Sequence, residues 1–350
     1  TEDGGGRALI NTFTSYNLIN RDLSRSLERV QSQPMVQRET EYYQENIGRV
    51  TSIEEFVNDD RLFRYAMKAH GLDDMAYAKA FMVKVLEEGI SDPESFANKL
   101  TDKRYAEFAR TYNFAAGGVD TTNYNPAQKG TVDKYLTRAL KNGASPSDPA
   151  LIGSINNYLA KIPDIKSVDD LMNDQEMLSF ALLAHGFDPD EVIDVKFLRS
   201  VLEGGIDDPG SPANQTEDKR YRALAEAFNF ARYGEDATTY NIANNLAVER
   251  YVRQTLEEDA GRENEGVRLA LYFQRKAPEF RSYYELLADK AIAEVVRTAL
   301  GFPAALAQAD IDKQVEMIKE RIDIEDFRDP EKLEDFLKRF TTMWELENPT

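Results

Sequence analysis

The chain has 350 residues, no cysteine and a formal net charge of −19 at pH 7. The lack of cysteine excludes thiol nucleophiles, thiolate metal sites and disulfide bonds. The acidic balance argues against a nucleic-acid partner, because phosphate binding requires concentrated Lys and Arg. No apolar run reaches the roughly 18 residues that span a bilayer, so we expect no membrane insertion.

The first expected element is a helix within residues 1–36. One polar and six apolar residues follow the alternating steps of four and three that are typical of a heptad seam, and a polar core residue can fix the register of such a seam. The helix binds a partner or another copy of the chain, or it docks on the chain's own modules; the sequence favours neither. The candidate partner-binding residues are Leu9, Phe13, Tyr16, Asn20, Leu23, Leu27 and Val30.

An internal repeat follows this helix. The sequence Ala-His-Gly at 69–71 returns at 184–186, and again at 299–301 with Leu in place of His. The interval of 115 residues (185 − 70) is domain-sized, longer than the roughly 20 to 50 residues of solenoid repeats. We expect each glycine to end a helix in the left-handed conformation.

Each copy also begins with the same helix-start signal. A serine precedes an acidic residue by three positions, the spacing of a capping box. An aspartate then precedes the helix that the glycine ends. The serines are Ser52, Ser167 and Ser282, and the aspartates are Asp59, Asp174 and Asp289.

Every apolar stretch has the period of a helix, and none alternates as a strand does. The sequence therefore predicts an all-α protein built from tandem helical modules of about 115 residues. We place an N-terminal arm at 1–36, repeat 1 at 37–150, repeat 2 at 151–265 and a shortened repeat 3 at 266–350. Repeat 3 stops before a counterpart of Tyr124-Asn125 and Tyr240-Asn241.

Two histidines are the first candidates for chemistry. His70 and His185 could transfer protons or bind a metal in each module. Alternatively, each is a structural residue whose partly cationic ring lies at the negative end of a helix. Leu300 occupies the third equivalent position, and leucine can replace packing but not ligation. The structural interpretation is favoured.

The motif Asp102-Lys103-Arg104-Tyr105, repeated at 218–221, could be an anion clamp. We favour a helix start in which Asp is the cap, Lys and Arg face water and Tyr makes the first core contact. The paired acids lack the spacing of a calcium loop. The sequence thus predicts no catalytic, metal-binding or cofactor-binding residue, and no cofactor.

A second seam lies near the C-terminus, where four residues step by four, three and four. Like the first seam, it packs either on a partner or on the chain's own repeats. Its residues are Leu333, Leu337, Phe340 and Trp344.

Several motifs together resemble a family of uncharacterised alphaproteobacterial proteins that is commonly associated with flagellar genes. The resemblance implies an all-α, flagellum-associated protein and carries over no catalytic residue. Its motifs are residues 37–43, 47–50, 56–71, 84–89, 97–100, 102–105 and Phe114.

We therefore expect a non-enzymatic structural or interaction protein of the bacterial flagellum, in assembly, in export or as an axial or accessory component. It would act through helical surfaces and terminal helices, by binding a protein partner or by self-association. It would stay in the cytoplasm or be exported without a cleaved signal peptide. Two alternatives remain open: a cytoplasmic regulatory adaptor that binds a basic partner, and an enzyme with an acidic cleft between modules.

Overall fold

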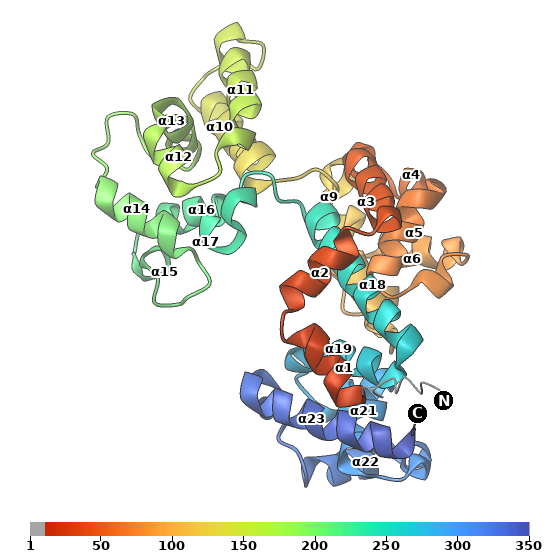
Figure 1. The fold of residues 1–350 in the computed structure, drawn as a ribbon. Helices are drawn as coiled ribbons and strands as arrows, with labels where there is room; N and C mark the ends of the chain where they lie inside the picture. The colour runs from red at the N-terminus through yellow and green to blue at the C-terminus, as the bar shows by residue number, and fades with distance from the viewer. Residues whose placement is uncertain (1–10, 350) are drawn as a thin grey trace, which may run out of the picture. The chain divides into compact units, whose positions relative to one another are not determined.

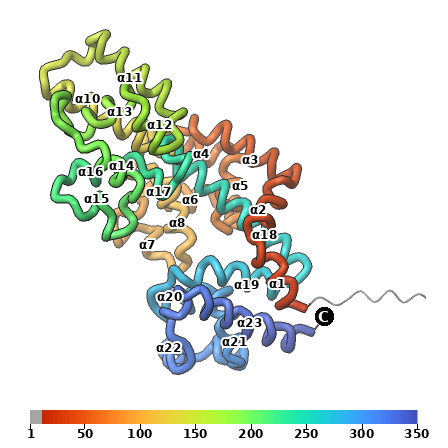
Figure 2. The backbone as a smooth tube through the Cα atoms, turned by 60° about the vertical axis from the view of Figure 1, so that its left-hand side comes forward, coloured from red at the N-terminus to blue at the C-terminus, as the bar shows by residue number. Residues whose placement is uncertain are grey.

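The computed structural model describes residues 11–349, and over that range it contains helices and no strand. The prediction of an all-α protein is confirmed. The chain forms two compact units (Figures 1 and 2). Unit 1 contains the described residues up to 46, residues 52–116 and the chain from 247 onward, and unit 2 contains residues 47–51 and 117–246.

Unit 1 begins with the arm and the helices of the first repeat. These are α1 (Thr12–Asn20), α2 (Leu23–Gln31), α3 (Pro34–Asn46), α4 (Ile53–Asn58), α5 (Asp60–Ala69), α6 (Lys79–Glu88), α7 (Phe96–Lys99), α8 (Arg104–Thr111) and α9 (Phe114–Gly117), whose last residue already belongs to unit 2. It is completed by α18 (Ala247–Glu263), α19 (Glu265–Lys276), α20 (Tyr283–Ala288), α21 (Lys290–Leu300), α22 (Ile311–Lys319) and α23 (Pro330–Glu347).

Unit 2 consists of α10 to α17 and the irregular turns between them. The helices are α10 (Thr131–Lys141), α11 (Pro149–Lys161), α12 (Val168–Asn173), α13 (Gln175–Ala184), α14 (Val195–Gly204), α15 (Pro212–Gln215), α16 (Lys219–Ala227) and α17 (Phe230–Tyr233). A π-helical turn precedes α10 at Pro126–Gly130, and another precedes α18 at Ile242–Leu246.

The helix starts follow the predicted caps. The side chains of Ser52, Ser167 and Ser282 accept hydrogen bonds from the backbone N–H three residues on, at 3.1, 3.0 and 3.2 Å. These bonds satisfy N–H groups that have no partner within the helix. In each copy the expected aspartate then caps the next helix in the same way, at α5, α13 and α21.

The glycine stops are confirmed as well. Gly71, Gly186 and Gly301 have φ of +68°, +95° and +66°, a conformation that costs other residues about 1 kcal/mol or more. Each glycine follows the last turn of the helix that the aspartate begins. The threefold Ala-x-Gly pattern is therefore a helix-ending device.

The compact units cut across the sequence repeats, because two equivalent helices are exchanged. Helix α18, from the second repeat, packs on α5 in unit 1, whereas α10, from the first repeat, packs on α13 in unit 2. Equivalent rings mark the exchange: Tyr251 stacks on Tyr65 with centroids 3.8 Å apart, and Tyr135 stacks on Phe180 at 3.9 Å. Each repeat thus supplies a helix to the unit that holds most of the other.

Two equivalent asparagines hold together the segments by which the chain enters and leaves unit 2. Asn125 Nδ2 donates to the Tyr240 carbonyl oxygen at 2.9 Å, and Asn241 Nδ2 donates to the Tyr124 carbonyl oxygen, also at 2.9 Å. Both asparagines are buried. Their reciprocal bonds satisfy carbonyls that regular helices cannot, because neither segment is α-helical here.

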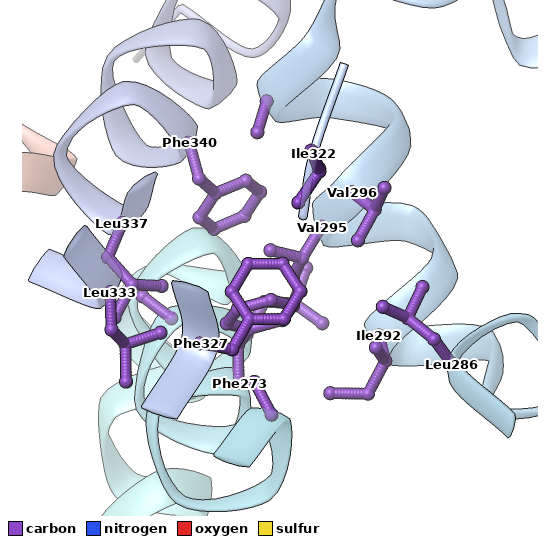
Figure 3. Close-up of a cluster of buried hydrophobic side chains, with 14 of the residues drawn as sticks. Phe273, Leu286, Ile292, Val295, Val296, Ile322, Phe327, Leu333, Leu337 and Phe340 are labelled. Carbon is purple, nitrogen blue, oxygen red and sulfur yellow. The ribbon is translucent and has the colours of Figure 1, made fainter. Parts of the chain in front are cut away.

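The third repeat folds onto its own core within unit 1. Buried side chains of α19, α20, α21 and α23 point toward one another, among them Phe273, Leu286, Ile292 and Phe340 (Figure 3). Helix α1 packs against α19 and α23 and adds Tyr16 to this core. Helix α1 of the N-terminal arm therefore completes the core of the third repeat.

Candidate functional site

The N-terminal seam is divided between two helices. α1 ends at Asn20 and α2 begins at Leu23, because Asp22 accepts a hydrogen bond from the Arg25 N–H at 3.2 Å and starts a new helix. Leu9 lies outside the described residues. The other six seam residues are described, and they belong to unit 1.

The α1 part of the seam docks through a polar network. The Tyr16 hydroxyl donates to Glu334 at 3.0 Å, Asn20 Nδ2 donates to Glu334 at 3.2 Å, and Gln274 donates to Asn20. Burial, and then the charge of Glu334, raise the pKa of Tyr16 well above its ordinary value. Asn20 thus specifies docking within the chain, as a polar core residue can. Its partners Glu334 and Gln274 are far away in the sequence, so no local sequence pattern predicts these contacts.

The remaining seam residues lie at varying depth. Val30 is 4% exposed, and Phe13, Leu23 and Leu27 are half-buried. The Nζ atom of Lys338 lies 5.6 Å from the centre of the Phe13 ring. Helix α2 packs mainly against α18 and also touches α3. The structure therefore places the seam against the chain itself, and binding of a partner by these residues stays a prediction.

The C-terminal seam is also part of a core. Leu333, Leu337 and Phe340 are buried, and Trp344 is partly buried against them. They all lie on α23, in the module that α1 completes. This seam too packs on the chain's own repeats.

His70 is a buried residue at the end of α5. Its Nδ1 lies 2.9 Å from the Ala66 carbonyl oxygen and its Nε2 lies 3.0 Å from Thr111 Oγ1. Because a carbonyl oxygen only accepts, the proton of the neutral ring is on Nδ1. Burial lowers the pKa of His70 to about 4. The expected partly cationic ring is therefore wrong: the low dielectric outweighs the helix end, and the ring is neutral.

His185 has the same place in unit 2 but one partner fewer. Its Nδ1 lies 2.8 Å from the Ala181 carbonyl oxygen, whereas the buried Nε2 has no hydrogen-bond partner among the described residues. The position equivalent to Thr111 (111 + 116 = 227) is Ala227. Burial lowers the pKa of His185 to about 4 as well. The packing of the ring is retained although one hydrogen bond is lost.

The Asp-Lys-Arg-Tyr motif is tied to the glycine stops. Arg104 forms a two-pronged ion pair with Asp102 and donates to the Gly71 carbonyl oxygen. Arg220 donates to the Gly186 carbonyl oxygen at 3.1 Å. The hydrogen bond to Asp102 is the largest cause of the raised pKa of Arg104. The expectation that this arginine simply faces water is wrong, because its guanidinium is bound by Asp102 and by the Gly71 carbonyl oxygen, which is 33 residues away in the sequence.

Unit 1 also contains buried charges that the sequence analysis missed. Glu257 is 2% exposed and accepts hydrogen bonds from Arg253 at 3.0 Å and Arg275 at 2.6 Å. Nearby, Lys276 donates to Glu107 at 2.9 Å. Burial raises the pKa of Glu107, but the positive charge of Lys276 outweighs it and the net shift is downward. These pairs fasten α18 to α19 and α19 to α8, so they stabilise the surroundings of the exchanged helix.

Unit 2 has two surface grooves. One, of about 220 Å³, is lined by Tyr124, Glu226, Ala227 and the stacked rings of Tyr233 and Tyr240. The other, of about 480 Å³, lies among α10, α11 and α13. Among residues 11–349, no three His, Asp or Glu side chains are grouped so that they could hold a metal ion. Over the same range, no helix is both long enough and apolar enough to cross a membrane.

Fold and contacts together define an all-helical protein that is internally repeated and exchanges helices between its repeats. A model of the family described as "protein of unknown function (DUF1217)" matches residues 69–195 and again residues 184–333. The chain belongs to this family, and the double match confirms the repeat. The chain is also similar to the crystal structure of protein AGR_C_984 from Agrobacterium tumefaciens, with 36% identity over 97% of this chain and 94% of that chain and a TM-score of 0.58. A search of curated proteins gave no match.

Proposed function

We propose that the chain is a non-enzymatic structural or interaction protein of the bacterial flagellum that acts through its helical surfaces and terminal helices. The observation that supports this most is how the chain uses its buried and half-buried polar side chains. Four of them form hydrogen bonds to backbone carbonyls or to neighbouring side chains: His70, Arg104, Asn125 and Glu257. Such groups set a fold; a catalytic group has to keep a donor or acceptor for its substrate.

The flagellar part of the proposal is supported by the motif resemblance. The residues that carry it include 102–105, where Arg104 holds the Gly71 carbonyl. These residues are structural in both repeats, so they identify a scaffold and name no reaction. The family description adds no function to this.

Deletion of the gene, followed by swimming assays and microscopy of the filaments, tests the proposal. We expect reduced swimming or altered filaments, restored by the wild-type chain and equally by a His70→Leu, His185→Leu double variant. Normal swimming and normal filaments in the deletion strain would refute the flagellar role. A double variant that folds and yet fails to restore swimming would favour the enzyme alternative, because Leu300 is already accommodated at the equivalent buried position of the third repeat.

The cytoplasmic adaptor is the second candidate, and the charge of −19 favours it. An adaptor of this charge would bind a basic partner, and the binding would weaken steeply with salt, since the Debye length falls to about 3 Å at 1 M. Seam-mediated binding would persist at high salt. Recovery of all of the protein from the cytoplasm of swimming cells would support the adaptor and contradict export.

A further inference from the structure

Helices α10 and α18 are at equivalent positions of repeats 1 and 2, but α18 packs against more helices than α10 does. α18 packs on α5, α19 and α2 in unit 1, whereas α10 packs mainly on α13 in unit 2. Leu256 of α18 is 6% exposed, while its counterpart Leu140 of α10 is 39% exposed. Val252 is likewise buried and its counterpart Leu136 is only half-buried.

The covering element in unit 1 can be identified as α2. Gln33, directly after α2, donates to Asp259 of α18 at 3.0 Å, which marks the side of α18 that faces the arm. Val252 and Leu256 lie seven and three residues before Asp259, and so they lie on that same side of the helix. In the described part of the chain, no counterpart of α2 packs on the matching side of α10, where Leu136 and Leu140 lie.

A groove lies beside α10, on the side that faces α11 and α13. It has a volume of about 480 Å³ and is lined by Tyr135 of α10 and by residues of α11 and α13 (the helices grouped in Figure 1). The equivalents of α10 and α11 are α18 and α3, and α2 touches both of them. In unit 1 the positions equivalent to the groove hold large side chains: Arg61 lies over the Tyr42 ring at 3.9 Å and pairs with Glu39 at 2.9 Å.

In unit 2 two of these positions hold smaller side chains, and the third holds a side chain of opposite charge. The counterparts of Tyr42, Arg61 and Glu39, found by adding 115, are Asn157, Glu176 and Ser154. Glu176 accepts a hydrogen bond from Asn157 and pairs with Lys161, with 2.8 Å between Oε2 and Nζ. The groove of unit 2 is therefore open where the equivalent positions of unit 1 are filled.

We propose that the side of α10 that carries Leu136 and Leu140 is a docking site for an amphipathic helix of a partner protein, one that carries aliphatic residues at the spacing of α2. On α2 the seam residues Leu23, Leu27 and Val30 stand at i, i+4 and i+7. The chain has two receiving helices but a single α2, and that α2 is docked on α18. A second copy would arrive with its arm equally engaged, so the occupant is a helix from a different protein. This inference rests on the proposed interaction role and names its receiving surface.

A peptide of residues 21–36 serves as the probe, because it carries the α2 seam without the rest of the arm. Its binding to the full-length chain is measured by fluorescence anisotropy. We expect saturable binding that Leu140→Glu weakens by at least about tenfold, since it places a carboxylate where the peptide should bury an apolar side chain. Leu346→Glu, at an exposed leucine of α23, is the matched control and should leave binding unchanged. A peptide with Leu27→Ser and Val30→Ser should not bind.

Equal binding to wild type and Leu140→Glu would overturn the proposal, because the peptide would then be exchanging with the chain's own α2. Circular dichroism verifies that Leu140→Glu is folded, and Leu140→Ser is the milder replacement if it is not. Light scattering of the chain without peptide tests whether a second copy of the chain occupies the site. A dimer that becomes a monomer in the Leu140→Glu variant would show that it does, and would overturn the assignment to a helix of a different protein. The peptide assay uses purified protein, so its failure is separate from any failure of the swimming test.

Discussion

The two buried histidines should make the protein lose stability as the pH falls from 7.5 to 5.0. Burial lowers the pKa of His70 and of His185 from 6.5 to about 4. Between these values the unfolded chain binds more protons than the folded chain, so the free energy of unfolding falls as the pH falls. A difference of 2.5 pKa units corresponds to about 3 kcal/mol per histidine when it is fully expressed.

At pH 5.0 most of this effect is already present. The unfolded histidines are then nearly all protonated and the folded ones mostly neutral, so each costs about 2 kcal/mol relative to pH 7.5. The paired carboxylate of Glu107 contributes little in this window. Burial raises the pKa of Glu107 but Lys276 brings it below its ordinary 4.5, so its contribution is lost only as the pH falls below that value. The fall in negative charge on acidification acts the other way, since it relieves self-repulsion.

Urea unfolding followed by circular dichroism at pH 7.5 and pH 5.0 measures the effect. The His70→Leu, His185→Leu double variant is compared with wild type, because Leu300 shows that leucine fits the equivalent site. The variant should lack the acid-induced loss, a difference of about 4 kcal/mol if both units unfold together. An identical loss in wild type and variant would refute the reasoning, since the titrating groups would then lie elsewhere.

Three further predictions concern single contacts, and urea unfolding at pH 7.5 checks each of them. Asn125→Ala should cost about 2–4 kcal/mol, because it removes a buried side chain that bonds two carbonyls; a loss under 0.5 kcal/mol would contradict the role of the crossing. Ala227→Thr should gain about 1 kcal/mol by giving His185 Nε2 a donor, and the groove beside Ala227 leaves room for it; destabilisation would mean that the hydroxyl is misplaced. Tyr16→Phe should cost about 1–2 kcal/mol by removing the donor to Glu334, and no change would show that the network contributes little.

Local features of this fold were predictable from the sequence, and the contacts between distant segments were not. Ser52 and Gly71 act within one helical turn, so their neighbours suffice to predict a cap and a stop. The hydrogen bond from Arg104 to the Gly71 carbonyl oxygen spans 33 residues, and neither motif predicts a contact with the other. The charge of His70 was misjudged for the same reason: its place at a helix end is local, but its burial is a property of the whole core.

The helix exchange shows why the internal repeat itself limits such predictions. Tyr135 and Tyr251 are the same residue in the same motif, so the pattern places each on a helix but cannot say which repeat receives it. Only the folded chain shows that Tyr251 stacks on Tyr65 and that Tyr135 stacks on Phe180. Likewise, the seam with Asn20 was equally compatible with a partner and with the chain's own surface.

The repeat also provides a comparison inside one chain that separates structural from functional positions. Where both copies keep a residue, as with Asn125 and Asn241, the residue makes the same bond twice and serves the fold. Where the sequence is kept but the surroundings differ, as with Leu256 and Leu140, the fold has already shown what the residue does when it is covered. An exposed leucine whose twin is buried under a helix is thus a more specific indication of docking than exposure alone. We therefore expect the interaction surfaces of this protein where equivalent residues of repeats 1 and 2 differ in their exposure.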